Sequence, residues 1–265
     1  MKNIILLIIC SLSTFLLYSQ KVVELKRFST PNATQAVAVD SFHFYSISNS
    51  QIVKYNKLTG VEAGRWEGPL KHLNSGIILN GKLYCANTNF PETPMASSIE
   101  IFDPKSLQHI GSHSFGMYIG SCTWLDRFDG NWYVMFVHYD KTGKERDMDA
   151  SYTTLVKFDD QWRRLAGWTV PKKLVDHLRP MSISGGFLGS DGKIYASPHH
   201  FEEIYILSFP KMGYELTWDT TLEVPFLGQG IARDPIEKGI LYGIHRKNRE
   251  VIQVNLGEYG RNNQD

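Results

Sequence analysis

The sequence lacks the features that identify many charge-driven or motif-based functions. Among 265 residues, 28 lysines and arginines stand against 27 aspartates and glutamates, so no excess charge of one sign is available to attract nucleic acid or an anionic membrane. No H-E-x-x-H or paired C-x-x-C motif is present, which excludes the zinc sites of fixed local spacing. A G-x-S-x-G elbow, a phosphate loop and a dinucleotide fingerprint are also missing. The expected partner is therefore a small-molecule ligand, neutral or singly charged, and no nucleic acid.

Long apolar runs are confined to the N-terminus. Lys2 is followed by an apolar stretch from Ile4 to Leu17 and then by small and polar residues, the pattern of a secretory signal peptide. The stretch is shorter than the roughly 18 to 20 apolar residues of a spanning helix, so we expect no membrane insertion of the mature chain. We predict a signal peptide over residues 1–20, cleaved near Ser19 or Gln20, and a single domain over 21–265 in a secreted or periplasmic location.

Cysteine is scarce as well. Outside the signal peptide only Cys85 and Cys122 remain, in a compartment that permits disulfides. The two residues either form one bond or stay as buried free thiols.

Helical periodicity is also scarce, whereas aromatic residues make up 12% of the chain and 22 glycines are present, which favours many short strands. Five segments share a polar residue followed by small and apolar ones, and they start 40, 46, 63 and 45 residues apart. They are "QAVA" from Gln35, "SGII" from Ser75, "SCTW" from Ser121, "SGGF" from Ser184 and "QGIA" from Gln229. Each precedes a tyrosine-bearing strand and a third strand, and all but the last unit add a fourth. The spacing is typical of the four-stranded blades of a β-propeller.

The last unit lacks its fourth strand, and an unassigned strand-like run, "KVVELKRFS", opens the mature chain at residues 21–29. That run can complete the last unit and close a ring. We therefore predict an all-β fold, a five-bladed β-propeller closed by the N-terminal strand, and we expect a monomer. Six blades are the alternative, if the longer third unit hides a degenerate one. Its extra residues otherwise form an exposed loop, "KTGKERDMDASY", and a short helix in "PKKLVDHLRP".

Two of the repeated segments resemble motifs of a known family. The stretch "NATQAV", with Thr34 and Gln35, partly matches an F-T-Q-G-L motif, and "LNSGI" matches F-G-E-G-L with Ser75 at the position of a functional glutamate. The chain resembles the plant-type glutaminyl cyclase (glutamine cyclotransferase) family, with weaker similarity to gluconolactonase-like and cycloisomerase-labelled propellers. The resemblance implies a five-bladed propeller over nearly the whole mature chain. The replacement of the acid by Ser75 argues against cyclase activity.

The polar residues at strand ends predict a site at one mouth of the central channel. His138, His199 and His245 end the second strands of three blades, where they would bind one divalent transition metal or act as acid and base, with Arg179 holding a carboxylate. The predicted ligand-binding residues around them are Gln35, His72, Asn74, Asn87, Trp124, His200 and Gln229. Each histidine can also be an ordinary residue of a polar turn.

Three functions remain open at this point. The first is an exported enzyme that performs hydrolysis, lactone opening or elimination on a small, carbohydrate-derived molecule at this mouth. The second is a non-catalytic propeller that binds a ligand or a protein loop there. The third is a diverged glutaminyl cyclase.

Overall fold

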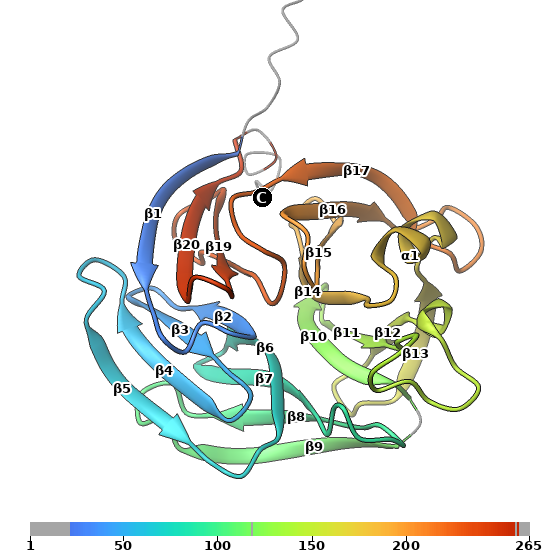
Figure 1. Ribbon diagram of the computed structural model, residues 1–265, viewed down its shortest axis with the longest axis horizontal. Coiled ribbons are helices and arrows are strands. Elements are labelled where there is room, and N and C mark those ends of the chain that lie inside the picture. The colour runs from blue at the N-terminus through green and yellow to red at the C-terminus, as the bar shows by residue number, and fades with distance from the viewer. Residues whose placement is uncertain (1–21, 118, 258, 260–265) are drawn as a thin grey trace, which may run out of the picture.

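In the part of the chain that the structure describes, twenty strands form five antiparallel sheets of four strands each, arranged as blades around a central axis (Figure 1). The structure is a computed structural model, and it describes residues 22–117, 119–257 and 259. The prediction of a five-bladed β-propeller is confirmed, and the six-bladed alternative is wrong, because the extra residues of the third unit form no further sheet. The signal peptide predicted for residues 1–20 lies outside the described residues.

The strands follow one another from the axis outwards in the first four blades. Blade 1 consists of β2 (Ala36–Val39), β3 (His43–Ile47), β4 (Gln51–Asn56) and β5 (Glu62–Glu67). Blade 2 consists of β6 (His72–Leu79), β7 (Lys82–Thr88), β8 (Ala96–Phe102) and β9 (His109–Met117). Blade 3 consists of β10 (Ser121–Phe128), β11 (Asn131–Val137), β12 (Thr154–Phe158) and β13 (Arg164–Thr169). Blade 4 consists of β14 (Ile183–Leu188), β15 (Ile194–Pro198), β16 (Glu203–Ser208) and β17 (Thr217–Glu223).

Blade 5 closes the ring with both ends of the chain. It contains β18 (Ala232–Arg233), β19 (Ile240–His245) and β20 (Glu250–Asn255), and its outer strand is β1 (Val23–Ser29), which pairs antiparallel with β20. The side chain of Arg27 on β1 forms an ion pair with Glu250 on β20 at 2.8 Å. The predicted closure by the N-terminal strand is therefore confirmed.

The inner strand of blade 5 is shorter than the pattern "QGIA" predicts. Gly228 and Gln229 have φ angles of +59° and +69°, in the left-handed region, so the extended chain begins only after them. The amide of Gly230 then donates a hydrogen bond to the carbonyl of Gln35 at 2.9 Å, which ties blade 5 to the inner strand of blade 1.

The hydrophobic core lies between the blades. Five clusters of buried apolar side chains are found in the described part of the chain, and each joins two neighbouring blades. The tyrosines of the second strands fill these interfaces, since Tyr45, Tyr195 and Tyr242 are almost completely buried. Successive side chains along a strand point to opposite faces of the blade, and each face packs against a neighbouring blade. Both faces of a blade are therefore apolar.

The additional residues of blade 3 pack beside the interface of blades 3 and 4. They include a 3-10 turn, η1 (Ala150–Tyr152), and the helix α1 (Lys172–Leu178), which buries Leu174, Val175 and Leu178 against the core between blades 3 and 4. The predicted short helix is thus confirmed. No helix among the described residues is long and apolar enough to cross a membrane.

Candidate functional site

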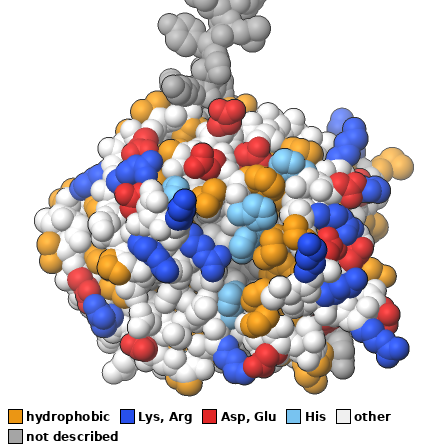
Figure 2. Space-filling view, viewed as in Figure 1, with side chains coloured by type: hydrophobic (Ala, Val, Ile, Leu, Met, Phe, Trp, Pro, Cys, Tyr) orange, Lys and Arg blue, Asp and Glu red, His pale blue; other side chains and the backbone are white. Residues whose placement is uncertain are grey.

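Polar side chains gather at the end of the channel where the second strand of each blade turns into the third. His199 and His200 lie between β15 and β16, His72 begins β6, and Arg246 lies in the turn between β19 and β20. Figure 2 shows histidine side chains beside the centre of this face, with several lysine and arginine side chains across from them. We call His72, His199, His200 and Arg246 the mouth cluster.

Arg246 is the central residue of this cluster. Its Nη1 lies 3.3 Å from Nε2 of His199, and the side chain is half-buried. No carboxylate of the described residues forms an ion pair with Arg246, and burial lowers its pKa, with the charge of Arg249 lowering it further. Its guanidinium therefore has donors and positive charge available for an anionic ligand.

Two histidines beside Arg246 are held in the neutral form. Burial lowers the pKa of His199 to about 4, and the nearby charge of Arg246 contributes to the shift. Burial and Arg246 likewise lower the pKa of His72 to about 4. Because a guanidinium only donates hydrogen bonds, Nε2 of His199 must be the acceptor. The proton of this ring is then on Nδ1, which lies 3.3 Å from Nδ1 of His200.

Buried amides support the backbone of the cluster. The side-chain amide of Gln229 donates a hydrogen bond to the carbonyl of His199 at 2.8 Å. The backbone amide of Gln229 donates another to the carbonyl of Pro198 at 2.7 Å. The side chain of Gln35 donates to Oδ1 of Asn49 at 2.7 Å. Gln35 and Gln229 are both less than 5% exposed, so they position the loops of the mouth and present little surface to a ligand.

His138 does not reach the mouth cluster. It is 3% exposed, and burial lowers its pKa. Its ring packs against Gly120, where an added Cβ would lie 2.8 Å from Nε2. In the described part of the chain, no three histidine, cysteine, aspartate or glutamate side chains are grouped so that they could hold one metal ion. The residues present therefore do not fit the predicted site of His138, His199 and His245.

His245 points into its own turn. Its Nδ1 accepts a hydrogen bond from the amide of Asn248 at 3.2 Å, which stabilises the tight connection between β19 and β20. The next residue, Arg246, occupies the mouth instead. The sequence therefore predicted residue 245 at the mouth, whereas the fold places the side chain of residue 246 at the mouth.

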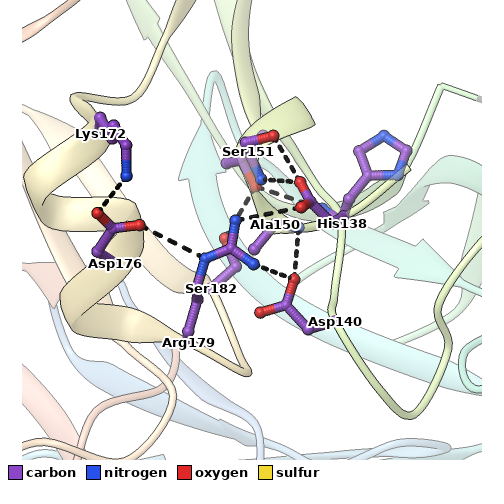
Figure 3. A network of polar contacts seen from close by, with 10 residues as sticks. His138, Asp140, Ala150, Ser151, Lys172, Asp176, Arg179 and Ser182 are labelled. Carbon is purple, nitrogen blue, oxygen red and sulfur yellow. Dashed lines mark hydrogen bonds and ion pairs between the residues drawn. The ribbon is translucent and has the colours of Figure 1, made fainter. Parts of the chain in front are cut away.

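Arg179 is occupied by carboxylates of the chain itself (Figure 3). Its guanidinium binds Asp140 at 2.6 Å and Asp149 at 3.2 Å, with Asp176 at 3.6 Å. A hydrogen bond from Ser151 is the largest cause that lowers the pKa of Asp149, to about 2. Arg179 therefore fastens the loop of blade 3 to the end of α1, and it is not available to hold the carboxylate of a substrate as the sequence predicted.

Three of the predicted ligand-binding residues have structural contacts instead. Trp124 is fully buried between blades 3 and 4, so its ring cannot stack on a ligand in the channel. Asn74 is 7% exposed and donates to the carbonyl of Cys122 at 2.8 Å, which joins blades 2 and 3. Asn87 donates to Oγ of Ser98 at 3.0 Å within blade 2. His72, His199 and His200 are the predicted residues that the fold does bring together.

Sequence reasoning missed Arg246, the residue on which the cluster depends. The segment "GIHRKNRE" has a basic residue, Arg246, directly after the histidine that ends the strand. This position in blade 5 corresponds to that of His199 in blade 4, because both residues follow the second strand of their blade. The sequence therefore contains two adjacent candidates, His245 and Arg246. Only the conformation of the turn after β19 determines which of the two side chains faces the mouth. Cys85 and Cys122, the other open question, are free and buried.

Comparisons with known proteins agree with this architecture. The search of family models and that of curated proteins both found no match. Among solved structures, the glutaminyl cyclase of Myxococcus xanthus superposes with a TM-score of 0.58 at 14% identity, over 88% of this chain and 95% of that one. A luciferin-regenerating enzyme superposes with a TM-score of 0.57 at 11% identity, over 88% and 94%. At such low identity the likeness shows a shared propeller fold, and not a shared family.

Proposed function

We propose that the chain is an exported enzyme that binds a small, carboxylate-bearing, carbohydrate-derived molecule at the mouth cluster and acts on it by acid–base catalysis. The single observation that supports this is the half-buried guanidinium of Arg246, which has no carboxylate partner among the described residues and lies 3.3 Å from the imidazole of His199. A ligand carboxylate would accept paired hydrogen bonds from the guanidinium.

Binding would also activate His199. In the free protein Nε2 of His199 accepts a hydrogen bond from Arg246, and burial and the positive charge keep its pKa at about 4. A bound carboxylate would draw the guanidinium away from this nitrogen and neutralise its charge. Both effects raise the pKa of His199 towards the range in which a histidine is an effective general base.

The chemistry open to such a base is limited. Nε2 could take a proton from a water molecule that attacks a lactone or ester carbonyl, and return it to the leaving oxygen. It could equally take a proton from the carbon next to the ligand carboxylate, which starts an elimination. His200 contacts the other ring nitrogen at 3.3 Å and would hold the tautomer in which Nε2 is free.

Binding and catalysis can be tested separately. Calorimetry with gluconate and glucuronate, with glucose as the neutral comparison, should show binding of the acids alone. Arg246→Gln should abolish that binding, and Arg65→Gln should not, because Arg65 is exposed on the outer strand of blade 1 and pairs with Glu62. If the acids fail to bind the folded wild-type protein, the proposal is wrong.

Turnover should then be measured on lactones and esters of the acids that bind. His199→Gln should retain binding but lose more than about 100-fold in rate, the usual contribution of a positioned acid or base. Binding of the acids without turnover would favour the second function, a non-catalytic binding propeller.

The metal-dependent and cyclase hypotheses have their own measurements. Elemental analysis of the purified protein should find less than one equivalent of transition metal, because the three predicted histidine ligands do not converge. A stoichiometric metal would instead favour metal-assisted chemistry. Peptides with an N-terminal glutamine should not be cyclised, since Ser75 replaces the acid of the cyclase motif, and cyclisation would restore that hypothesis.

A further inference from the structure

The turn between β19 and β20 carries three basic side chains within four residues. Arg246 is the half-buried one and belongs to the mouth cluster, whereas Lys247 and Arg249 are exposed. No carboxylate of the described residues forms an ion pair with any of the three. Figure 2 shows lysine and arginine side chains gathered over this turn, next to the centre of the face. We call Arg246, Lys247 and Arg249 the basic turn.

The carboxylate that follows the basic turn does not neutralise it. Oε2 of Glu250 lies 2.8 Å from Nη1 of Arg27 on β1, so this acid is paired with the outer strand of the blade. The side chain of Asn248 donates a longer hydrogen bond to the same oxygen, at 3.4 Å. Arg249 lies close enough to Arg246 to lower its pKa, as the second cause after burial. Because like charges near each other are unfavourable, an anionic ligand that contacts both side chains would stabilise the turn.

Neutral hydrogen-bonding groups lie beside the basic turn. The amide of Thr30 donates a hydrogen bond to the carbonyl of Arg249 at 2.8 Å, which ties the turn to the connection between β1 and β2. Further along this connection, the side chain of Asn32 donates a hydrogen bond to that of Gln51 at the start of β4. Asn32 and Gln51 are half-buried, and Asn49 in the preceding turn is exposed. Carboxamides both donate and accept hydrogen bonds, so these side chains can bind the hydroxyl groups of a sugar.

We infer that the ligand of the mouth cluster is a sugar acid with a second anionic group, a carboxylate or a phosphate, which Lys247 and Arg249 bind while Arg246 holds the first carboxylate. The planar guanidinium of Arg249 can donate paired hydrogen bonds to either kind of anion, and Lys247 adds a point charge. The inference rests on the proposed function, because Arg246 supplies the first anionic contact, and it narrows the substrate class from sugar acids in general to those with two negative groups.

Gluconate, glucarate and 6-phosphogluconate are matched probes. They share a six-carbon chain and one carboxylate, and they carry a hydroxyl, a second carboxylate or a phosphate at the far end. Calorimetry on the full mature chain at low ionic strength should show at least one dianion binding more tightly than gluconate. The expected gain is about fourfold to 25-fold, since each of the two added ion pairs is worth about twofold to fivefold at an exposed position. The dianion that binds more tightly identifies the second group as carboxylate or phosphate.

Variants of the basic turn test which side chains bind the second group. The quantity to compare is the ratio of the Kd of gluconate to the Kd of the dianion. Arg249→Gln and Lys247→Gln should each lower this ratio by about twofold to fivefold, because each removes one exposed ion pair. Arg65→Gln is the matched control and should leave the ratio unchanged, since Arg65 pairs with Glu62 on the outer strand of blade 1. Added salt should also lower the ratio, because exposed charges are screened.

The outcomes separate this inference from the proposed function. Thermal melting shows whether each variant is folded. If gluconate binds and neither dianion exceeds it by more than about twofold, a gain that two equivalent carboxylates give by statistics alone, the inference is overturned and the proposed function stands. A larger preference that both folded glutamine variants retain would also overturn it. If none of the three sugar acids binds the folded wild-type protein, the proposed function fails together with the inference.

Discussion

The clearest quantitative consequence of the mouth cluster is a loss of stability in mild acid. The pKa values of His72 and His199 are about 4 in the folded protein, against 6.5 for an ordinary histidine. Between these values the unfolded chain binds more protons than the folded one, so protonation favours unfolding. The stabilising contribution is complete above pH 6.5 and is lost as the pH falls towards 4.

The size of this effect follows from the two pKa values. Lowering the pH from 7 to 5 should reduce the free energy of unfolding by about 2 kcal/mol for each of the two histidines, as an upper estimate because the sites interact. Arg246→Gln removes the charge but not the burial. We therefore expect both pKa values to rise in this variant, so that the acid-induced loss of stability becomes smaller.

Two measurements test this reasoning. Titration of the histidine ring protons by NMR gives the pKa values directly, and urea unfolding at pH 7 and pH 5 gives the change in stability. Arg65→Gln is the control, since Arg65 is exposed and pairs with Glu62 on the outer strand. Titration of His72 and His199 near pH 6.5 in the wild-type protein would refute the assignment. Unchanged pKa values in Arg246→Gln would show that Arg246 is not the cause.

Three further predictions concern the ring. Removal of residues 21–29 should unfold or aggregate the protein, because β20 would lose its partner β1 and become an open edge; a truncated protein that melts like the mature one would contradict this closure. Gly230→Ala should destabilise the fold by about 1–3 kcal/mol in urea unfolding, since the new Cβ would lie 2.4 Å from that of Ala36, whereas Gly111→Ala, where the nearest atom to an added Cβ is Cδ1 of Ile101 at 3.7 Å, should cost less. Cys85 and Cys122 should resist a thiol reagent until the protein unfolds, because both are fully buried and burial raises their pKa; rapid labelling of the native protein would show that the interface opens.

The sequence by itself determined the architecture. Five repeated units, their approximate spacing and the unpaired strand at residues 21–29 predicted the number of blades and the closure by β1, which the structure confirms. These features depend on local rules: strand alternation, turn residues and the need to pair an edge. The same rules placed His199, His200 and His72 at one mouth.

The identity of the side chains that meet at that mouth was decided only by the tertiary structure. A β-bulge between Cys122 and Trp124 interrupts the alternation of β10, and Trp124 is buried between blades and does not line the channel as a predicted ligand-binding residue would. The turn after β19 directs His245 back to Asn248 and presents Arg246 to His199. Arg179 meets Asp140 and Asp149 only because the loop of blade 3 folds over α1. The side chains that reach the mouth thus depend on bulges, on turn geometry and on charged residues far apart in the chain. The alternation of polar and apolar residues along one strand gives no information about any of these.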